Sequence, residues 1–141
     1  MLYAAIRGPA ATGIWVTENG GATWHPTSQN EDLIYVLRAD PHQTGVAVGL
    51  TPNGLLRTAD AGRTWQAFGP GGFEDFTVLD FSFGAGRPST VFLVVTTQPT
   101  TSIYEIDGRS GRSVLLPRDP REGADPSVIS ADLEDPCQVD A

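Results

Sequence analysis

The chain has 141 residues and a formal net charge of −8 at pH 7. That acidic balance argues against a nucleic-acid partner, which needs a basic surface, and no apolar run reaches the roughly 18 residues that a membrane span requires. A single cysteine, Cys137, excludes an intrachain disulfide and a zinc site built from thiolates. Gly and Pro are abundant and no stretch keeps a helical period, so the composition indicates one domain of short strands joined by turns.

The predicted strands follow one another in a repeating cycle of four types. In chain order they are Leu2–Ile6, Gly13–Thr17, Thr23–Pro26, Ile34–Asp40, Gly45–Leu50, Gly54–Thr58, Thr64–Phe68, Val78–Phe83, Val91–Thr97, Ser102–Ile106, Ser113–Leu116 and Val128–Leu133. Each type occurs three times, which predicts three four-stranded antiparallel units. Their bounds are roughly 1–33, 34–76 and 77–126, with the first unit completed by a strand within 127–135.

Two segments of the chain superimpose without a gap. Gly13–Trp24 aligns with Gly54–Trp65, 41 positions later, and the shared pattern is Thr-x-Asn/Asp-x-Gly-x-Thr-Trp. A period near 40 residues is typical of a solenoid or a propeller. Each copy predicts a strand, a tight turn and a second strand. The side chains of Asn19 and Asp60 should accept bonds from backbone N–H groups of their own turns, and Trp24 and Trp65 should be largely buried.

A third, altered copy is predicted over Tyr104–Val114. It keeps an acidic residue, Asp107, but has two extra residues before Gly111 and places Val114 where the other copies have Trp. Because Val is a smaller anchor than Trp, this hairpin should be held less firmly.

The repeated pattern resembles the Asp-box, also called the BNR repeat, of sialidases, xyloglucan-degrading glycosidases, sortilin-type receptors and photosystem II assembly factors. The matching positions are Thr17, Asn19, Gly21, Thr23 and Trp24 in one copy, and Thr58, Asp60, Gly62, Thr64 and Trp65 in the other. The resemblance implies an all-β propeller of four-stranded antiparallel blades, about three of them in this chain. In that family the box lies on the outer hairpin of a blade, away from the ligand face, so these ten residues are expected to be structural.

Three blades are fewer than the four to eight that usually close a propeller. Either two copies close a six-bladed ring, or the chain is a fragment of a longer protein. In both cases the strand Val128–Leu133 is expected to pair with Leu2–Ile6, of this chain or of a neighbouring copy. The first residues show no secretory leader. The alternatives are therefore a cytoplasmic protein or a segment of a longer chain, for which an extracellular or periplasmic location stays open.

Few residues suit catalysis. Glycoside hydrolysis needs two carboxylates facing one cleft, and the candidates in loops are Asp40, Glu74, Asp75 and Asp80. Asp40 precedes a proline and is better explained as a turn former. Arg7-Gly8-Pro9 matches a loose sialidase element, but it stands in a different strand context from that family. The two histidines, His25 and His42, have no acid or serine placed to pair with them, so no catalytic residue, metal site or cofactor is predicted.

The long glycine-rich connection after the second box is the best candidate for a contact surface, because loops on a rigid scaffold commonly carry function. Its candidate residues are Phe68, Gly71, Phe73 and Asp75. We therefore expect a non-catalytic scaffold that binds protein or carbohydrate, with a homo-oligomer as one way to close the ring. The alternatives are part of a sialidase-like or xyloglucanase-like glycoside hydrolase, and a structural spacer in a long repeat protein. The chain alone is expected to hydrolyse no glycoside.

Overall fold

The computed structural model describes residues 1–9, 11–28, 34–71, 77–86, 89–97, 100–117, 130–131 and 139–140. Within these ranges the regular structure is β-strand throughout, which confirms the all-β class. No helix in this part of the chain could cross a membrane. The chain divides into two compact units, Met1–Phe68 and Gly69–Ala141.

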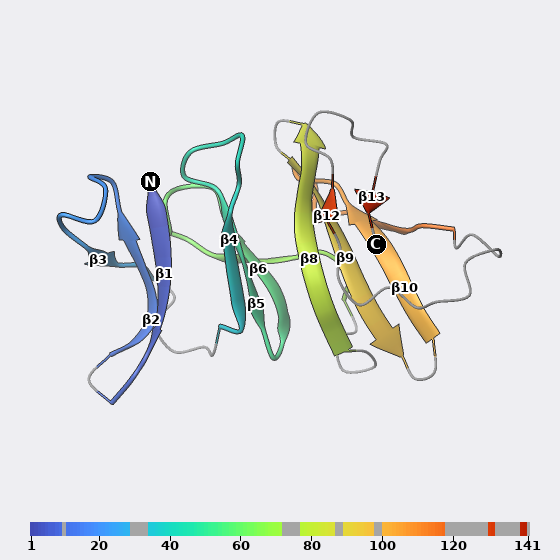
Figure 1. Ribbon diagram of the computed structural model, residues 1–141, viewed down its shortest axis with the longest axis horizontal. Helices are drawn as coiled ribbons and strands as arrows, with labels where there is room; N and C mark the ends of the chain where they lie inside the picture. The colour runs from blue at the N-terminus through green and yellow to red at the C-terminus, as the bar shows by residue number, and fades with distance from the viewer. Residues whose placement is uncertain are drawn as a thin grey trace. The chain divides into compact units, whose positions relative to one another are not determined.

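The first unit contains two antiparallel sheets (Figure 1). One has three strands in the order β1-β2-β3, and the other has four in the order β4-β5-β6-β7. Each strand therefore pairs with its neighbour in sequence. The bounds are Leu2–Arg7 for β1, Thr12–Thr17 for β2, His25–Pro26 for β3, Val36–Ala39 for β4, Ala47–Thr51 for β5, Gly54–Thr58 for β6 and Gln66–Phe68 for β7.

The second unit contains a four-stranded antiparallel sheet in the order β11-β10-β9-β8, and a two-stranded sheet of β12 and β13. The bounds are Thr77–Gly86 for β8, Ser89–Thr97 for β9, Thr100–Ile106 for β10, Ser113–Leu115 for β11, Ser130–Ala131 for β12 and Val139–Asp140 for β13. Its core is the continuous apolar run of β9, in which Val91, Leu93 and Val94 are fully buried. Such a run is typical of a strand with both faces covered.

The strand that follows each of the three turns is shorter than predicted. Thr23 and Thr64 were expected to open strands, but β3 begins at His25 and β7 at Gln66. The reason is that the backbone N–H groups of Thr23 and Thr64 donate to the side chains of Asn19 and Asp60, at 2.9 and 2.8 Å. These two residues therefore belong to the turn.

Within this chain the described part of the C-terminal strand does not pair with Leu2–Ile6, and its pairing with a neighbouring copy stays a prediction. Ser130 and Ala131 pair with Asp140 and Val139, in the short strand β13 that the sequence did not predict. Closing a short loop costs less conformational entropy than closing one that spans nearly the whole chain, so the local partner is favoured.

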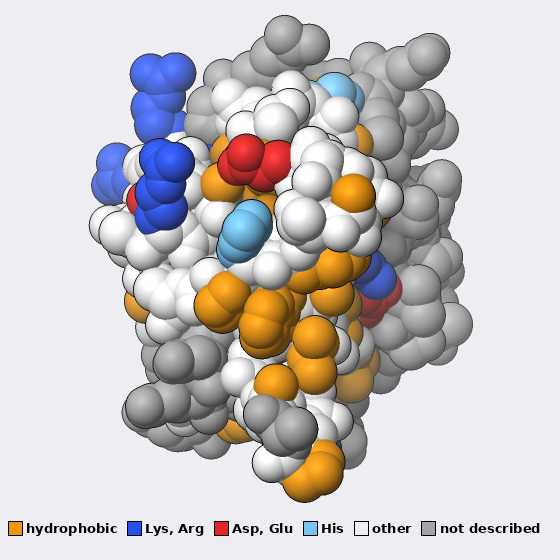
Figure 2. All heavy atoms as spheres, turned by 90° about the vertical axis from the view of Figure 1, so that its left-hand side faces the viewer, with side chains coloured by type: hydrophobic (Ala, Val, Ile, Leu, Met, Phe, Trp, Pro, Cys, Tyr) orange, Lys and Arg blue, Asp and Glu red, His pale blue; other side chains and the backbone are white. Residues whose placement is uncertain are grey.

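Strand β1 differs sharply in exposure from β5, which holds the same place in the next sheet. Their pairings with β2 and β6 make Leu2 equivalent to Ala47 and Ala5 equivalent to Leu50. All of β5 is buried, whereas Leu2 is 52% and Ile6 41% exposed. Figure 2 looks at the side of the molecule where β1–β3 lie and shows hydrophobic side chains gathered there. Strand β4 covers the edge of β5, and no described strand covers that edge of β1.

Candidate functional site

The two repeated turns are built from the same hydrogen bonds. In the first, Thr17 Oγ1 donates to Asn19 Oδ1 at 2.9 Å and accepts from the Gly21 N–H at 3.0 Å. In the second, Thr58 Oγ1 donates to Asp60 Oδ1 and accepts from the Gly62 N–H, both at 2.9 Å. As predicted, Asn19 and Asp60 accept backbone N–H bonds within their own turns.

One bond runs in opposite directions in the two turns. The Asn19 amide nitrogen donates to Thr23 Oγ1 at 2.8 Å, whereas Thr64 Oγ1 donates to Asp60 Oδ2 at 2.6 Å. A hydroxyl can donate or accept, so threonine at this position suits either an amide or a carboxylate. This explains how Asn and Asp serve equally well in one pattern.

The Asp60 carboxylate is fully engaged in holding its turn. Hydrogen bonds from the Thr64 side chain and backbone, and then from Thr58, lower the pKa of Asp60 below its ordinary value. A carboxylate stabilised in its charged form by several donors is a poor general acid at neutral pH. The geometry therefore gives Asp60 a structural role.

The third turn has a different construction. Asp107 Oδ1 accepts from the backbone N–H of Ser110 and from its hydroxyl, both at 2.7 Å. These bonds lower the pKa of Asp107. Glu105 stands where the other turns have the buried threonine. The bridging hydroxyl here belongs to Ser110, which donates to Asp107 Oδ1 and accepts from the Arg112 N–H at 3.2 Å. Val114 is 64% exposed and anchors nothing.

The expectation of two largely buried tryptophans is wrong for Trp24, which is 38% exposed, while Trp65 is half-buried. The segment that follows the first sheet accounts for the difference. The backbone N–H of Ser28 donates to Gly62 O at 3.1 Å, and Thr27 packs directly against Gly62, beside the Trp65 ring. In the structure, the Trp65 Nε1–H is buried without an acceptor among the described residues.

The second turn also supports a neighbouring loop. The Ala61 N–H donates to Gly45 O at 2.9 Å, which connects the Asp60 turn to the residues between β4 and β5. Within that loop the His42 N–H donates to Asp40 Oδ1 at 2.8 Å, and the Asp40 N–H donates to Val46 O at 2.9 Å. Asp40 is a turn former, as the sequence predicted.

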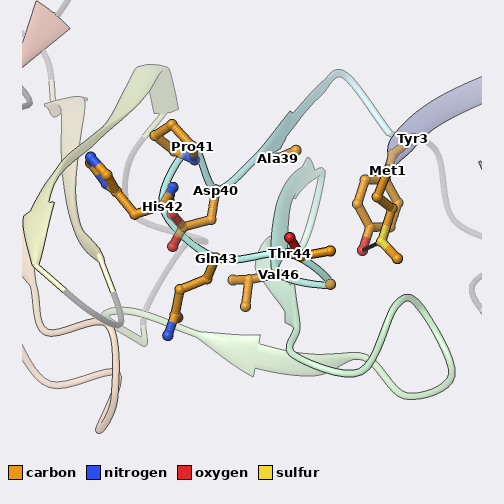
Figure 3. Close-up of a pocket in the computed structure, with 10 residues that line it drawn as sticks. Met1, Tyr3, Ala39, Asp40, Pro41, His42, Gln43, Thr44 and Val46 are labelled. Carbon is orange, nitrogen blue, oxygen red and sulfur yellow. Dashed lines mark hydrogen bonds between the residues drawn. The ribbon is translucent and has the colours of Figure 1, made fainter. Parts of the chain in front are cut away.

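This loop forms one wall of a polar pocket of about 150 Å³. Figure 3 shows Asp40, Pro41 and His42 on one side and Met1, which precedes β1, and Tyr3 of β1 on the other. The remaining lining residues complete the loop: Ala39, Gln43, Thr44, Gly45 and Val46. The Tyr3 hydroxyl donates to Met1 Sδ at 3.3 Å.

The pocket combines hydrogen-bonding groups with a ring that stays neutral. Burial raises the pKa of Tyr3 to about 12, and the negative charges of Asp60 and Glu18 add to the effect. Tyr3 is therefore a hydrogen-bond donor at neutral pH. Asp40 is buried, and its charge opposes the lowering of the Arg57 pKa that burial causes.

The predicted contact loop is only partly described. Phe68 is buried, and the Arg57 guanidinium lies 5.7 Å from the centre of its ring, so it packs inside its sheet and is not a contact residue. Gly71 is exposed with no neighbouring atoms around it. Phe73 and Asp75 lie outside the described residues, as do Glu74 and Cys137.

The remaining candidates do not line the pocket. Asp80 is buried in β8 of the second unit, and Arg7 ends β1. No cluster of three metal-ligating side chains occurs in the part of the chain that the structure describes. The sequence did not predict the pocket, because its walls come from residues about 40 positions apart. The run Asp40-Pro41-His42-Gln43, which forms one wall, was predicted only as a turn.

Known proteins were compared with the chain at the level of family models and of curated sequences. No protein-family model matches the chain, and no curated protein matches it either.

Proposed function

We propose that this chain belongs to an Asp-box β-propeller and acts as a non-catalytic binding module. The observation that carries the proposal is the Ala61–Gly45 hydrogen bond, through which the Asp60 turn supports the loop that walls the pocket. The polar groups of the box residues form the hydrogen bonds that hold this turn in place. A rigid scaffold that positions a loop is the usual arrangement of a binding site.

The pocket suits a small polar group rich in hydroxyls. Asp40, His42, Gln43 and Tyr3 offer acceptors and donors, and Tyr3 adds an aromatic ring. At about 150 Å³ the pocket is smaller than the roughly 300–1,000 Å³ of sites for drug-sized ligands. It therefore fits one sugar residue of a glycan, or one polar side chain of a protein partner.

The hydrolase alternative gains no support from the pocket. Cleavage of a glycoside needs two carboxyl groups about 5–5.5 or 6.5–9.5 Å apart, and Asp40 is the one carboxylate among the described lining residues. Binding without bond cleavage is what this set of groups can do.

A glycan array, followed by titration calorimetry with the best ligand, tests the proposal. Asp40→Asn and Gln43→Ala should each weaken binding at least tenfold, because both residues line the pocket. Gln66→Ala is the matched control, since Gln66 is exposed on β7 and does not line the pocket. Glycan binding that both pocket variants leave unchanged would reject the pocket. Binding to a protein and to no glycan would assign the pocket to a side chain of a protein partner.

A further inference from the structure

None of the described strands pairs with the outer edge of β1, and the backbone bonds of β1 show which groups line that edge. The Gly8 N–H donates to Ala11 O at 2.9 Å, just beyond the last β1–β2 pair. Because antiparallel strands alternate, the even-numbered residues of β1 bond to β2. The main-chain N–H and C=O groups of Tyr3 and Ala5 therefore point away from β2, toward this outer edge.

In the next sheet the equivalent edge, that of β5, is paired with β4. Leu50 O accepts from the Tyr35 N–H at 2.8 Å, and Val46 O accepts from the Asp40 N–H at 2.9 Å, both from the β4 side. Leu50 is equivalent to Ala5. An antiparallel strand thus fits at this position of the repeat.

The other described edge strands carry features that discourage pairing with another chain. Strand β3 is two residues long and includes Pro26, β7 and β11 have three residues each, and β12 and β13 have two each. Strand β4 carries Arg38, and β8 has the buried carboxyl group of Asp80 beside a break in register. Short length, proline, charge and bulges are the usual means of protecting an edge. Strand β1 has six residues, no proline, and no charged side chain before Arg7.

We propose that β1 pairs antiparallel with β1 of a second copy of this chain, across a twofold axis. With Ala4 opposite Ala4 of the second copy, Tyr3 lies opposite Ala5 and their outward groups exchange main-chain hydrogen bonds. Leu2 then lies opposite Ile6 in a pair that makes no such bonds, where side chains approach most closely.

The strand is self-complementary in this one register. The pairing covers the two large apolar side chains that β1 exposes, Leu2 and Ile6, and the small Ala4 allows close approach at the axis. Among these central pairs no charged groups face each other. Exposed edges with this character are pairing sites for other strands. The dimer is separate from the proposed pocket function, and either can fail without the other.

Light scattering with size-exclusion chromatography on the whole chain gives the first test. The mass should be twice the 15.0 kDa of one chain. Ala5→Pro should yield a monomer with an unchanged far-ultraviolet spectrum, because it removes an edge N–H that the sheet itself does not use, and proline is tolerated at edges. A wild-type monomer at about 100 µM, or an Ala5→Pro dimer as stable as wild type, would overturn the proposal.

Opposite charges at the axis give a second test that does not depend on proline. Ala4→Lys and Ala4→Glu should each be monomeric, because like charges would face each other, and a mixture of the two should form a heterodimer. Val114→Lys is the matched control, since it places the same charge on an exposed strand position of β11 and should leave the dimer intact. Dimers of Ala4→Lys alone, or no heterodimer on mixing, would contradict this register.

Discussion

Ala61 and Gly20 occupy the same place in their turns, and both have a left-handed backbone, with φ of 62° and 70°. Glycine adopts this conformation without steric cost, whereas a residue with a β-carbon is sterically strained in it. Ala61 also donates the hydrogen bond that holds the pocket loop at Gly45. The strained residue therefore lies directly behind the candidate site.

Replacing Ala61 by glycine should raise the free energy of unfolding, by roughly 0.5–1 kcal/mol, because it removes the steric cost of the left-handed conformation. Denaturant unfolding measures the change. Ala59→Gly is the control: Ala59 is exposed, has no positive φ and should lose stability on the same change. Equal losses for both variants would show that Ala61 is not strained.

Gly62→Ala should be much more harmful than Gly20→Ala. Both glycines have positive φ, so each variant should lose roughly 0.5–1 kcal/mol from strain, the same amount as expected at Ala61. A β-carbon at Gly62 would also lie 2.8 Å from Thr27 Cβ and closer still to Thr27 Cγ2, whereas nothing lies within 4 Å of one at Gly20. Combining Gly62→Ala with Thr27→Ala should restore part of the loss. Equal melting temperatures for the two single variants would contradict the packing of Thr27 on Gly62.

Thr58→Val should cost about 1–3 kcal/mol of unfolding free energy, because it leaves the buried Gly62 N–H without its acceptor. Valine keeps the shape of threonine, so the loss reports the hydroxyl. Thr100→Val, at an exposed position of β10, should change stability by less than about 0.5 kcal/mol. Urea unfolding should give clearly different free energies of unfolding for the two variants. An unchanged free energy of unfolding for Thr58→Val would show that the Thr58 hydroxyl does not stabilise the turn.

The carboxylate of Asp60 should make stability depend on pH. Its pKa in the folded protein is lowered from 3.8, so its contribution is fully present above that value and is lost as the pH falls through the folded pKa. The free energy of unfolding of wild type should therefore fall, relative to that of Asp60→Asn, as the pH drops from 5 toward 2. Asn19→Asp should acquire the same dependence in the first turn. Parallel pH profiles for wild type and Asp60→Asn would be inconsistent with the lowered pKa.

Much of the fold could be predicted because its signals are local. Gly54–Thr58 was predicted to the residue as β6, since the strand and its turn chemistry lie in one short segment. The hydrogen bonds of Asn19 and Asp60 were predictable for the same reason. Residue burial was harder: Trp24 and Trp65 match in sequence, but only Trp65 has the Thr27 segment beside its turn.

The candidate site and the C-terminal pairing depend on contacts between distant parts of the chain. The pocket joins Tyr3 to the loop at Asp40, and no sequence period links those two positions. Within this chain Ser130–Ala131 pair with the nearby Val139–Asp140, a strand that the repeat did not suggest. Phe68 was assigned to a contact loop, but it lies on a buried strand face where Arg57 covers its ring.

Saturation-transfer NMR on the whole chain, with a sialoside or β-glucoside in the same tube, tests binding without catalysis most directly. Magnetisation should transfer to a sugar ring with wild type and with Gln66→Ala and not with Asp40→Asn, and the glycoside signals should stay unchanged over a day. Steady appearance of free sugar, abolished by Asp40→Asn or Arg7→Ala, would show that the protein is a hydrolase and contradict binding without catalysis.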